Sequence, residues 1–399
     1  MKRSPLPPSC LVSVVLLAAA VACNQSSSQS LSQSSGQSSG QSSNPPSDST
    51  QASSTQASST QESSTRESST RVSIEDHNAP PPQTIEEIRR TAEAGDPLGQ
   101  NNLAFAYTFG KGVEQNYEEA AQWFSLAASA GYAPSQFNLG ALYENGLGVS
   151  QDDWKSYALI RAASLQGYAP AEERLGYFYE KGKAVPVNFA EAARWYRAAA
   201  QQGIAAAQCE LGNLYHAGRG VGHDDAEAAK WYRMAAELGN AAAQNNLGSF
   251  YHHGNGLGRD YDLALFWYRK AAAQGLEAAN NNLGVMYEDG LGTAKDYRRS
   301  AALYAEAARR GLIRAQYNLA TMYYSGRGVP LDYVSAYLWY GRAAAAGDSS
   351  AAKVLKQLSG VMTPNQKELA QARLTESLAA SILEEPTHSP FDTARVNPK

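Results

Sequence analysis

Apolar and polar positions along most of this chain follow one pattern that recurs every 36 residues. Each unit begins with an apolar stripe in which Gly99, Leu103 and Tyr107 are four residues apart, so they share one face of a helix. A second stripe follows with the spacing i, i+3, i+4 and i+7 of another amphipathic helix. In the first unit this second stripe is Ala120, Trp123, Phe124 and Ala127. The pattern therefore predicts a pair of helices in every unit.

The register holds without insertion over residues 84–358. Glycine recurs at Gly95, Gly131, Gly167, Gly203, Gly239, Gly275, Gly311 and Gly347, and tryptophan at Trp123, Trp195, Trp231, Trp267 and Trp339. Helix pairs with a fixed period of this size bury their apolar stripes by stacking on one another. The sequence predicts an all-α fold, a right-handed α-solenoid superhelix of 36-residue helix-pair repeats, in which the tryptophans fill the gap between helices.

Helix caps are expected at both ends of the array. Thr84 and Glu87 have the spacing of a capping box, in which each side chain bonds the other residue's backbone N–H. Thr363 and Gln366 have the same spacing before a last helix. We assign residues 359–385 to this C-terminal capping helix, whose apolar side would lie against the last unit.

The first 22 residues have the pattern of a signal peptide, 1–22. A basic start precedes an apolar run that is too short to span a bilayer. The run ends in Ala20-Val21-Ala22-Cys23, which resembles a bacterial lipobox. The resemblance implies that Cys23 carries a diacylglycerol, and Asn24 in place of Asp implies the outer membrane. The alternative is an ordinary secretory signal that is cut after Ala22.

Residues 23–83 are rich in Ser, Gln and Thr and contain few large apolar side chains. Such a segment cannot bury enough surface to offset the entropy lost on ordering, so it is predicted to be a disordered tether. Residues 386–399 are predicted to be a disordered tail.

Charge and cysteine content exclude two classes of protein. Lys and Arg number 34 and Asp and Glu number 38, for a net charge of −4, whereas nucleic-acid binding relies on a clustered basic excess. Three cysteines exclude a disulfide scaffold. Once Cys10 is removed and Cys23 is lipidated, Cys209 would remain as a small, partly buried thiol.

One stretch of the repeat shows which known family the pattern is like. In residues 227–257 the recurrent positions are Ala228, Trp231, Tyr232, Ala235, Ala236, Gly239, Ala243, Gln244, Asn246, Leu247, Gly248, Tyr251, Gly254 and Gly256. They resemble the Sel-one-like repeat family, a relative of the tetratricopeptide repeat, and the resemblance covers residues 84–358. In tetratricopeptide proteins one face of the first helix lines a concave groove, so the resemblance implies the same face here.

That face has four rows of side chains, at i, i+4, i+7 and i+8 of the first helix in each unit. The first row is Asn101, Phe137, Glu173, Cys209, Asn245, Asn281 and Tyr317, and the second is Phe105, Ala141, Tyr177, Asn213, Ser249, Val285 and Thr321. The third is Thr108, Glu144, Glu180, His216, His252, Glu288 and Tyr324, and the fourth is Phe109, Asn145, Lys181, Ala217, His253, Asp289 and Ser325. Exposed aromatic, acidic and histidine side chains suit a protein or peptide partner. The predicted partner-binding residues are Phe105, Phe109, Phe137, Glu144, Tyr177, Glu180, His216, His252, Glu288, Tyr317 and Tyr324.

A row of asparagines beside this face has two interpretations. Its members are Asn102, Asn138, Asn246, Asn282 and Asn318. They could hold the backbone of an extended peptide, or each amide could tie a loop to its neighbour. We favour the structural interpretation, because residues that are identical in many units mark the stack rather than a ligand.

Catalytic and metal-binding patterns are weak. His216, His252 and His253 fall in adjacent units, and helix spacing makes a shared metal site awkward. Ser350 and Lys353 match the Ser-x-x-Lys of penicillin-interacting enzymes, but the accompanying motifs are missing. The cysteine-rich branch of the resembled family is linked to β-lactam hydrolysis and carries a cysteine pair in each repeat, which this chain lacks. We expect no catalytic residue, no metal and no cofactor.

The favoured prediction is a monomeric lipoprotein of the bacterial cell envelope that is anchored in the outer membrane through Cys23 and faces the periplasm. It would act as a scaffold that gathers protein partners of the envelope in the concave groove, without binding nucleic acid. One alternative is a hydrolase of β-lactams or peptidoglycan fragments. Another is a surface-exposed or secreted factor that engages a host or another cell.

Overall fold

The computed structural model describes residues 84–383, and within them it contains seventeen helices and no strand. The helices are α2 (Ile85–Glu93), α3 (Pro97–Phe109), α4 (Tyr117–Ser129), α5 (Ala133–Asn145), α6 (Asp153–Ser164), α7 (Ala169–Lys181), α8 (Phe189–Gln201), α9 (Ala205–Ala217), α10 (Asp225–Glu237), α11 (Ala241–His253), α12 (Tyr261–Ala273), α13 (Glu277–Asp289), α14 (Tyr297–Arg309), α15 (Ile313–Ser325), α16 (Tyr333–Ala345), α17 (Ser349–Val361) and α18 (Pro364–Leu383). The predicted signal peptide (1–22), tether (23–83) and tail (386–399) lie outside the described residues.

Side chains and glycines at the helix ends explain why each unit contains two short helices. The second helix of every repeat begins after an Asn or Asp whose side chain accepts backbone N–H bonds of the first turn, as Asn116 does for Glu118 and Glu119. The first helix ends at a glycine in the left-handed region, for example Gly110 at φ 65°. Both signals are local, so the same two breaks recur in every unit.

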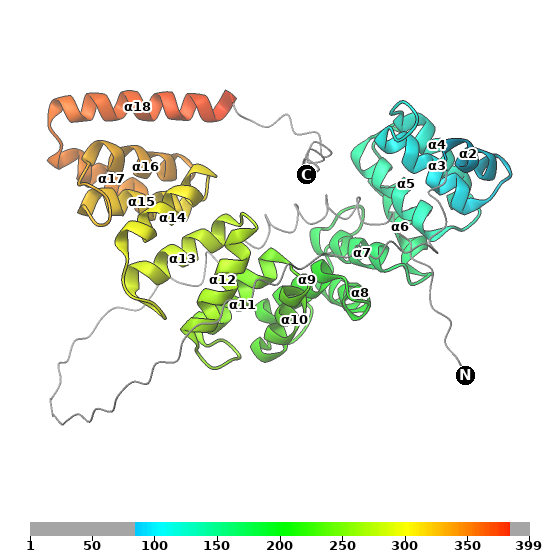
Figure 1. Cartoon of the computed structure of the whole chain (residues 1–399), viewed down its shortest axis with the longest axis horizontal. Helices are drawn as coiled ribbons and strands as arrows, with labels where there is room; N and C mark the ends of the chain where they lie inside the picture. Colours follow the sequence, from blue (N-terminus) through cyan, green and yellow to red (C-terminus); the bar gives the residue numbers. More distant parts are fainter. Residues whose placement is uncertain (1–83, 384–399) are drawn as a thin grey trace, which may run out of the picture.

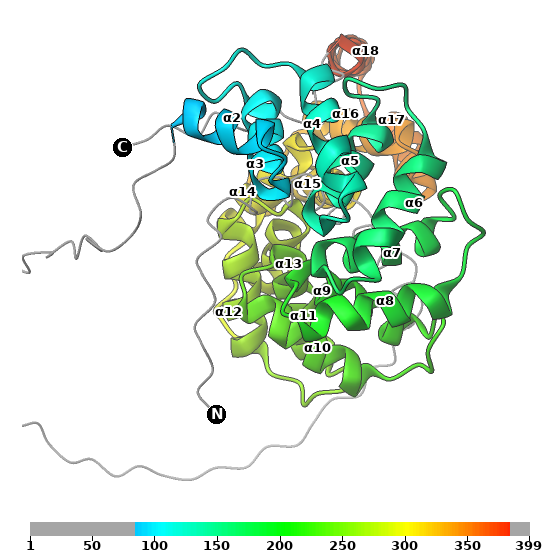
Figure 2. The ribbon, with the colours of Figure 1, turned by 90° about the vertical axis from the view of Figure 1, so that its right-hand side faces the viewer.

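The helix pairs stack into a coil. From α2 to α17 each helix packs against the next one along the chain, and the stack curves as an arc in Figure 1. In Figure 2 the chain runs clockwise as it recedes from the viewer, which is a right-handed path. The same view places α9, α11, α13 and α15 nearer the middle of the coil and α8, α10, α12 and α14 around its outside. The first helices of the units therefore line the inner face.

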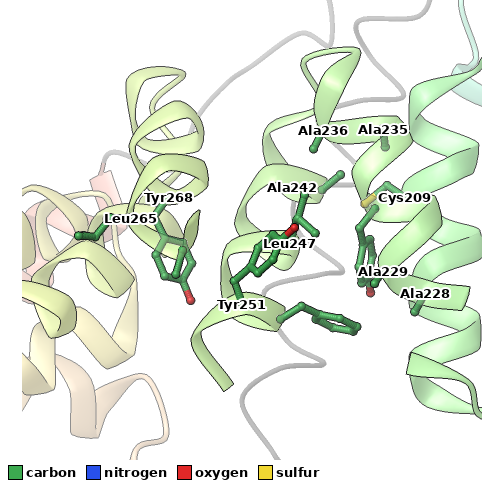
Figure 3. Close-up of a cluster of buried hydrophobic side chains, with 14 of the residues drawn as sticks. Cys209, Ala228, Ala229, Ala235, Ala236, Ala242, Leu247, Tyr251, Leu265 and Tyr268 are labelled. Atoms are coloured by element: carbon green, nitrogen blue, oxygen red, sulfur yellow. The ribbon is translucent and has the colours of Figure 1, made fainter. Parts of the chain in front are cut away.

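Tyrosines fill the space between the helices, and the tryptophans do not. The largest fully buried side chains are Phe124, Tyr196, Tyr232, Tyr268, Tyr304 and Tyr340, each one residue after a position of the tryptophan row. The tryptophans themselves are half-buried, which corrects the prediction that they fill the gap. In Figure 3 Leu247 and Tyr251 of α11 lie between the helix that carries Tyr268 and the one that carries Ala228 and Ala229.

A glycine in the middle of the first helix makes room for four of the five buried tyrosines. A methyl group on Gly212 would lie 2.7 Å from the ring of Tyr232, and one on Gly284 would lie 2.5 Å from the ring of Tyr304. Such distances are shorter than van der Waals contact, so even the smallest side chain would force the helices apart. The seventh unit is the exception, because it has Ala320 at the glycine position and its Tyr340 is nevertheless buried.

Both predicted end caps are present. Thr84 Oγ1 accepts the Glu87 N–H at 3.2 Å, while the Thr84 N–H donates to Glu87 Oε2 at 2.9 Å. Thr363 and Gln366 make the same reciprocal pair at the start of α18. Helix α18 packs on α16, where Leu374 lies over Gly341. The apolar side of the last helix thus lies against the last complete unit, as the sequence predicts.

Candidate protein-interaction face

The first row of the predicted face is not at the surface. Six of its seven residues, Asn101, Phe137, Glu173, Cys209, Asn245 and Asn281, are buried, and Tyr317 is half-buried. The reason is geometric: the first helix of each unit lies beside the first helix of the next, and the first row points into this contact. Cys209 is fully buried, not partly buried as expected.

The prediction that Phe137 and Glu144 are exposed for partner binding is wrong, because both side chains are buried. Phe137 is only 8% exposed and packs edge-on against Tyr168, with ring centroids 5.7 Å apart. Glu144 is only 6% exposed. Both residues belong to the contact between consecutive units, and neither presents its side chain to a partner.

Aromatic residues at the two ends of the face are half-buried or exposed. The Phe105 and Phe109 rings stack with centroids 5.9 Å apart, and Phe105 also meets Phe124 of the core edge-on. At the other end Tyr317 packs on Tyr340. Tyr324 is 42% exposed, so it is the most accessible of the predicted aromatic residues.

The predicted histidines have partners within the chain. His216 Nδ1 lies 2.6 Å from Asp225 Oδ1, and its ring packs on Phe250. His252 stacks on His253 with centroids 4.5 Å apart. Burial, together with the charge of His253, lowers the pKa of His252 to about 4. Among the described residues, no three His, Cys, Asp or Glu side chains are grouped as a metal site requires.

Two predicted acidic residues of the third row, Glu180 and Glu288, bind the hydroxyls of buried tyrosines. The Tyr196 hydroxyl donates to Glu180 Oε2 at 2.8 Å, and Glu180 also pairs with Lys181. The Tyr304 hydroxyl donates to Glu288 Oε2 at 2.9 Å, and Glu288 also pairs with Arg327 at 3.1 Å. These carboxylates satisfy tyrosine hydroxyls that would otherwise be buried without a partner, so they serve the core as well as the face.

A charged junction closes the contact between α5 and α7. Arg174 donates two hydrogen bonds to Glu144, and Lys183 Nζ lies 2.9 Å from Glu144 Oε1 and 3.2 Å from Asp153 Oδ1. Burial raises the pKa of Glu144, but Arg174 and Lys183 outweigh this effect and hold it below its ordinary value. The Arg174 guanidinium also lies 4.4 Å above the Tyr177 ring.

At other junctions asparagines join the first helices of neighbouring units. Asn282 Nδ2 donates to Asn245 Oδ1 and Asn318 Nδ2 donates to Asn281 Oδ1, both at 2.9 Å. At the first junction Asn138 Nδ2 lies 3.4 Å from Asn101 Oδ1. The structural interpretation of the asparagine row is confirmed, with the difference that the amides join first helices of neighbouring units rather than loops.

The accessible part of the inner face is a strip made of the second and fourth rows. Every residue of the second row is half-buried, and the fourth row is exposed from Asn145 to Ser325. Lys181, His253 and Asp289 belong to this strip, although they were not singled out among the predicted binding residues. The feature of the sequence that points to these three residues is that their positions vary from unit to unit. The aromatic and acidic side chains of the third row were the stronger indication of binding, so these three were not chosen.

The remaining candidate chemistry lies at the surface. Ser350 and Lys353 are both exposed on the first turns of α17, where the Ser350 N–H donates to the cap residue Asp348. Within residues 84–383 no helix combines the length and apolar character that crossing a membrane requires.

Comparison with known proteins agrees with the helix-pair stack. The Sel1 repeat family matches seven consecutive segments, 97–132, 133–168, 169–204, 205–240, 241–276, 277–312 and 313–348. No curated protein matches the chain. Proteins built from Sel1 repeats are generally scaffolds for protein interactions.

Two solved structures are similar over most of the chain. One is a protective antigen of uropathogenic Escherichia coli with an SLR fold, 32% identical, with a TM-score of 0.63; the match covers 74% of this chain and 64% of that one, which is less than two thirds of its length. The other is a Sel1 repeat protein from Oxalobacter formigenes, 34% identical, with a TM-score of 0.56, and the match covers 69% of this chain and 79% of that one. With seven repeats in register, this chain belongs to the Sel1 repeat family.

Proposed function

We propose that the chain is a scaffold that holds an extended segment of a protein partner along the strip formed by the second and fourth rows. The observation that carries this proposal is the contrast between rows. Leucine, glycine and alanine recur at the positions that build the stack, whereas the strip differs in every unit, from Phe109 to Lys181 to Asp289. A preformed, rigid face loses little entropy when a partner binds.

Site-specific crosslinking in cells tests this proposal. A photoreactive residue is placed on the strip at Asn145, Lys181 or His253, and in control variants on the exposed outer face at Arg194 or Lys230. Discrete crosslinked proteins are expected from the strip positions only. Crosslinks from the outer face alone would contradict the assignment of the inner face.

A charge-swapped pair provides a second test. Lys181→Glu with Asp289→Lys changes the strip without changing net charge, and Lys230→Glu with Asp262→Lys is the matched control on α10 and α12. Partner capture should be lost in the first variant and kept in the second. Both variants should unfold at the wild-type temperature, because all four side chains are exposed.

We further propose that the scaffold works as a monomer anchored through lipid on Cys23, in the outer membrane and facing the periplasm. The lipobox-like sequence supports the anchor, and the helices that close both ends of the stack support the monomer. Cys23→Ser should release the protein from the membrane fraction and abolish fatty-acid labelling. Mass spectrometry of the mature chain distinguishes the alternative, an unmodified terminus after cleavage at Ala22.

One comparison favours a second candidate, exposure at the cell surface. The relative from uropathogenic E. coli is described as a protective antigen, and an antibody that recognises an intact cell binds only what the cell exposes. Protease treatment of intact cells separates the two orientations. Cleavage within residues 23–83 in intact cells supports surface exposure, whereas cleavage only after the outer membrane is opened supports a periplasmic scaffold.

A further inference from the structure

The strip of the second and fourth rows carries two opposite charges. Lys181 of α7 is its only lysine or arginine, and Asp289 of α13 is its only aspartate or glutamate. Both side chains are exposed. Apart from His253, every other residue of the strip is apolar or neutral. These two positions therefore set the charges that a partner on the strip encounters.

Asp289 presents a carboxylate without an ion pair. Its neighbour Glu288 pairs with Arg327 at 3.1 Å, whereas the Asp289 carboxylate makes no ion pair and no hydrogen bond within residues 84–383. Val285 lies one helical turn before Asp289 and is half-buried. The aliphatic stem of a lysine or arginine can lie on Val285 while its charged end binds the carboxylate. This part of the strip fits a basic side chain.

Lys181 is the more exposed member of an ion pair. Its Nζ lies 2.7 Å from Glu180 Oε1, and 37% of the lysine side chain is exposed against 14% of the glutamate side chain. Glu180 also accepts the hydroxyl of the buried Tyr196, which directs the carboxylate towards the core. Because an ammonium group has three hydrogens to donate, Lys181 can bind a second carboxylate and keep Glu180. This part of the strip fits an acidic side chain.

The first unit of the strip is aromatic. The rings of Phe105 and Phe109 stack with centroids 5.9 Å apart, and both side chains are half-buried. The second unit adds only Ala141 and Asn145, so no charge of the strip lies between the phenylalanines and Lys181. A stacked ring pair of this kind fits an apolar side chain of a partner.

The distance between these three places corresponds to a length of partner chain. Neighbouring first helices are about 10 Å apart, and an extended chain advances about 3.3 Å per residue, so one unit spans about three residues. Helices α3 and α7 are two units apart, and α7 and α13 are three units apart. The acidic residue therefore belongs about six residues from the apolar one, and the basic residue about nine residues beyond the acidic one.

We propose that the strip selects an extended segment with an apolar side chain at Phe105 and Phe109, a carboxylate at Lys181 and a lysine or arginine at Asp289. The proposal rests on the strip being the face that binds the partner, and it adds the chemistry and spacing of the bound segment. A segment with the two charges exchanged places like charges together at both sites. The same two residues thus attract one class of segment and reject the other.

Fluorescently labelled synthetic peptides test the proposal by anisotropy with the purified full-length chain. The pattern peptide carries leucine, glutamate and lysine at this spacing in a background of glycine, serine and glutamine, and the exchanged peptide has its glutamate and lysine interchanged. Each is made in both chain directions, because the order of side chains does not fix the direction of the backbone. We expect the pattern peptide to bind about tenfold more tightly at low salt, and the ratio to shrink as salt screens the charges.

A charge-swapped variant provides the decisive comparison. Lys181→Glu with Asp289→Lys should reverse the preference, whereas Lys230→Glu with Asp262→Lys on the outer face should leave it unchanged. Asp289→Asn removes one charge with little change in shape and should lower the ratio about threefold, including in the case that the double variant does not fold. Equal binding of the two peptides to the wild-type chain, or the same preference in the charge-swapped variant, would overturn the proposal.

Spacing and crosslinking complete the test. A pattern peptide whose glutamate and lysine are brought to half their separation should lose its advantage over the exchanged peptide, and an undiminished advantage would refute the assignment to α7 and α13. Crosslinks from Asn145 or His253 combined with no charge preference among the peptides would refute this pattern and leave the strip as the binding face. Absence of crosslinks from the strip would refute both.

Discussion

The contacts among α11, α13 and α15 and those among α5, α7 and α9 use helices of equal length in the same register, yet different chemistry closes them. In the first region Asn282 and Asn318 donate to neutral amides. In the second region Arg174 and Lys183 surround the buried Glu144. Neutral amides pair at little desolvation cost, whereas buried charges require complete pairing or a proton. A regular backbone therefore does not imply uniform stability along the coil.

The largest effect is expected where one buried charge compensates two others. Glu144→Gln leaves Arg174 and Lys183 without their shared carboxylate, and we expect a loss of about 3 kcal/mol in the free energy of unfolding. Chemical denaturation at neutral pH measures the loss, and Glu237→Gln on the exposed side of α10 is the control. An effect no larger than that of the control would show that the charged junction contributes little.

The same substitution has a pH signature. Because the pKa of Glu144 lies below its ordinary value in the folded chain, its contribution is present at neutral pH and is lost as the pH falls through the acid range. The difference in stability between the wild-type chain and Glu144→Gln should therefore shrink on acidification.

A packing substitution should affect the two regions equally. Gly284→Ala in α13 places a methyl group 2.5 Å from the Tyr304 ring, and Gly176→Ala in α7 places one 2.7 Å from the Tyr196 ring. We expect each to cost about 2 kcal/mol, since both overpack a filled site. Thermal unfolding of the two variants tests whether the tyrosine layer is common to both regions; a much smaller cost in α7 would show that the charged junction is already loose.

Removing one amide bond should have a smaller, pH-independent effect. Asn281→Ala leaves Asn318 without its acceptor and is expected to cost about 1 kcal/mol. A double-mutant cycle with Asn318→Ala isolates the coupling between the two side chains. A coupling energy that varies between acid and alkaline pH would contradict the view that this region is held by neutral groups.

The smallest effect is a gain. Gln166 and Gln274 each donate at 2.8 Å to a glutamine on the first helix of the same unit, but Gln208 Oε1 is buried without a donor because Leu238 occupies the equivalent position. Since Leu238 is 60% exposed, Leu238→Gln sacrifices little burial and supplies the missing donor. The free energy of unfolding should rise by about 0.5 kcal/mol. Leu238→Ala, which offers no donor, should show no gain.

Local signals made most of the fold predictable. The spacing of Leu103 and Tyr107 defines a helix face, glycine ends the helix, and Thr84 with Glu87 caps the first one; each signal acts within a few residues. Repetition then predicts the stack, because a helix pair that cannot bury its stripe alone must pair with its copy.

The candidate face was predictable only in part. An apolar stripe does not say which of two adjacent aromatic residues turns inward, so the tryptophans were wrongly assigned to the gap that Tyr232 and its equivalents fill. Phe137 and Glu144 were expected at the surface because helix periodicity alone cannot show where the neighbouring first helix lies. The strip that is exposed, including Lys181 and Asp289, emerges only once that neighbour is in place.

By itself, the sequence determined the helix pairs, their period and their family, since these rest on spacings within about one turn and on a repeat that holds register. The tertiary structure decided which rows are buried, which amides join, and that Glu144 meets a lysine 39 residues away. Contacts between units depend on the rotation of one helix pair against the next, and no spacing within a single unit encodes that rotation.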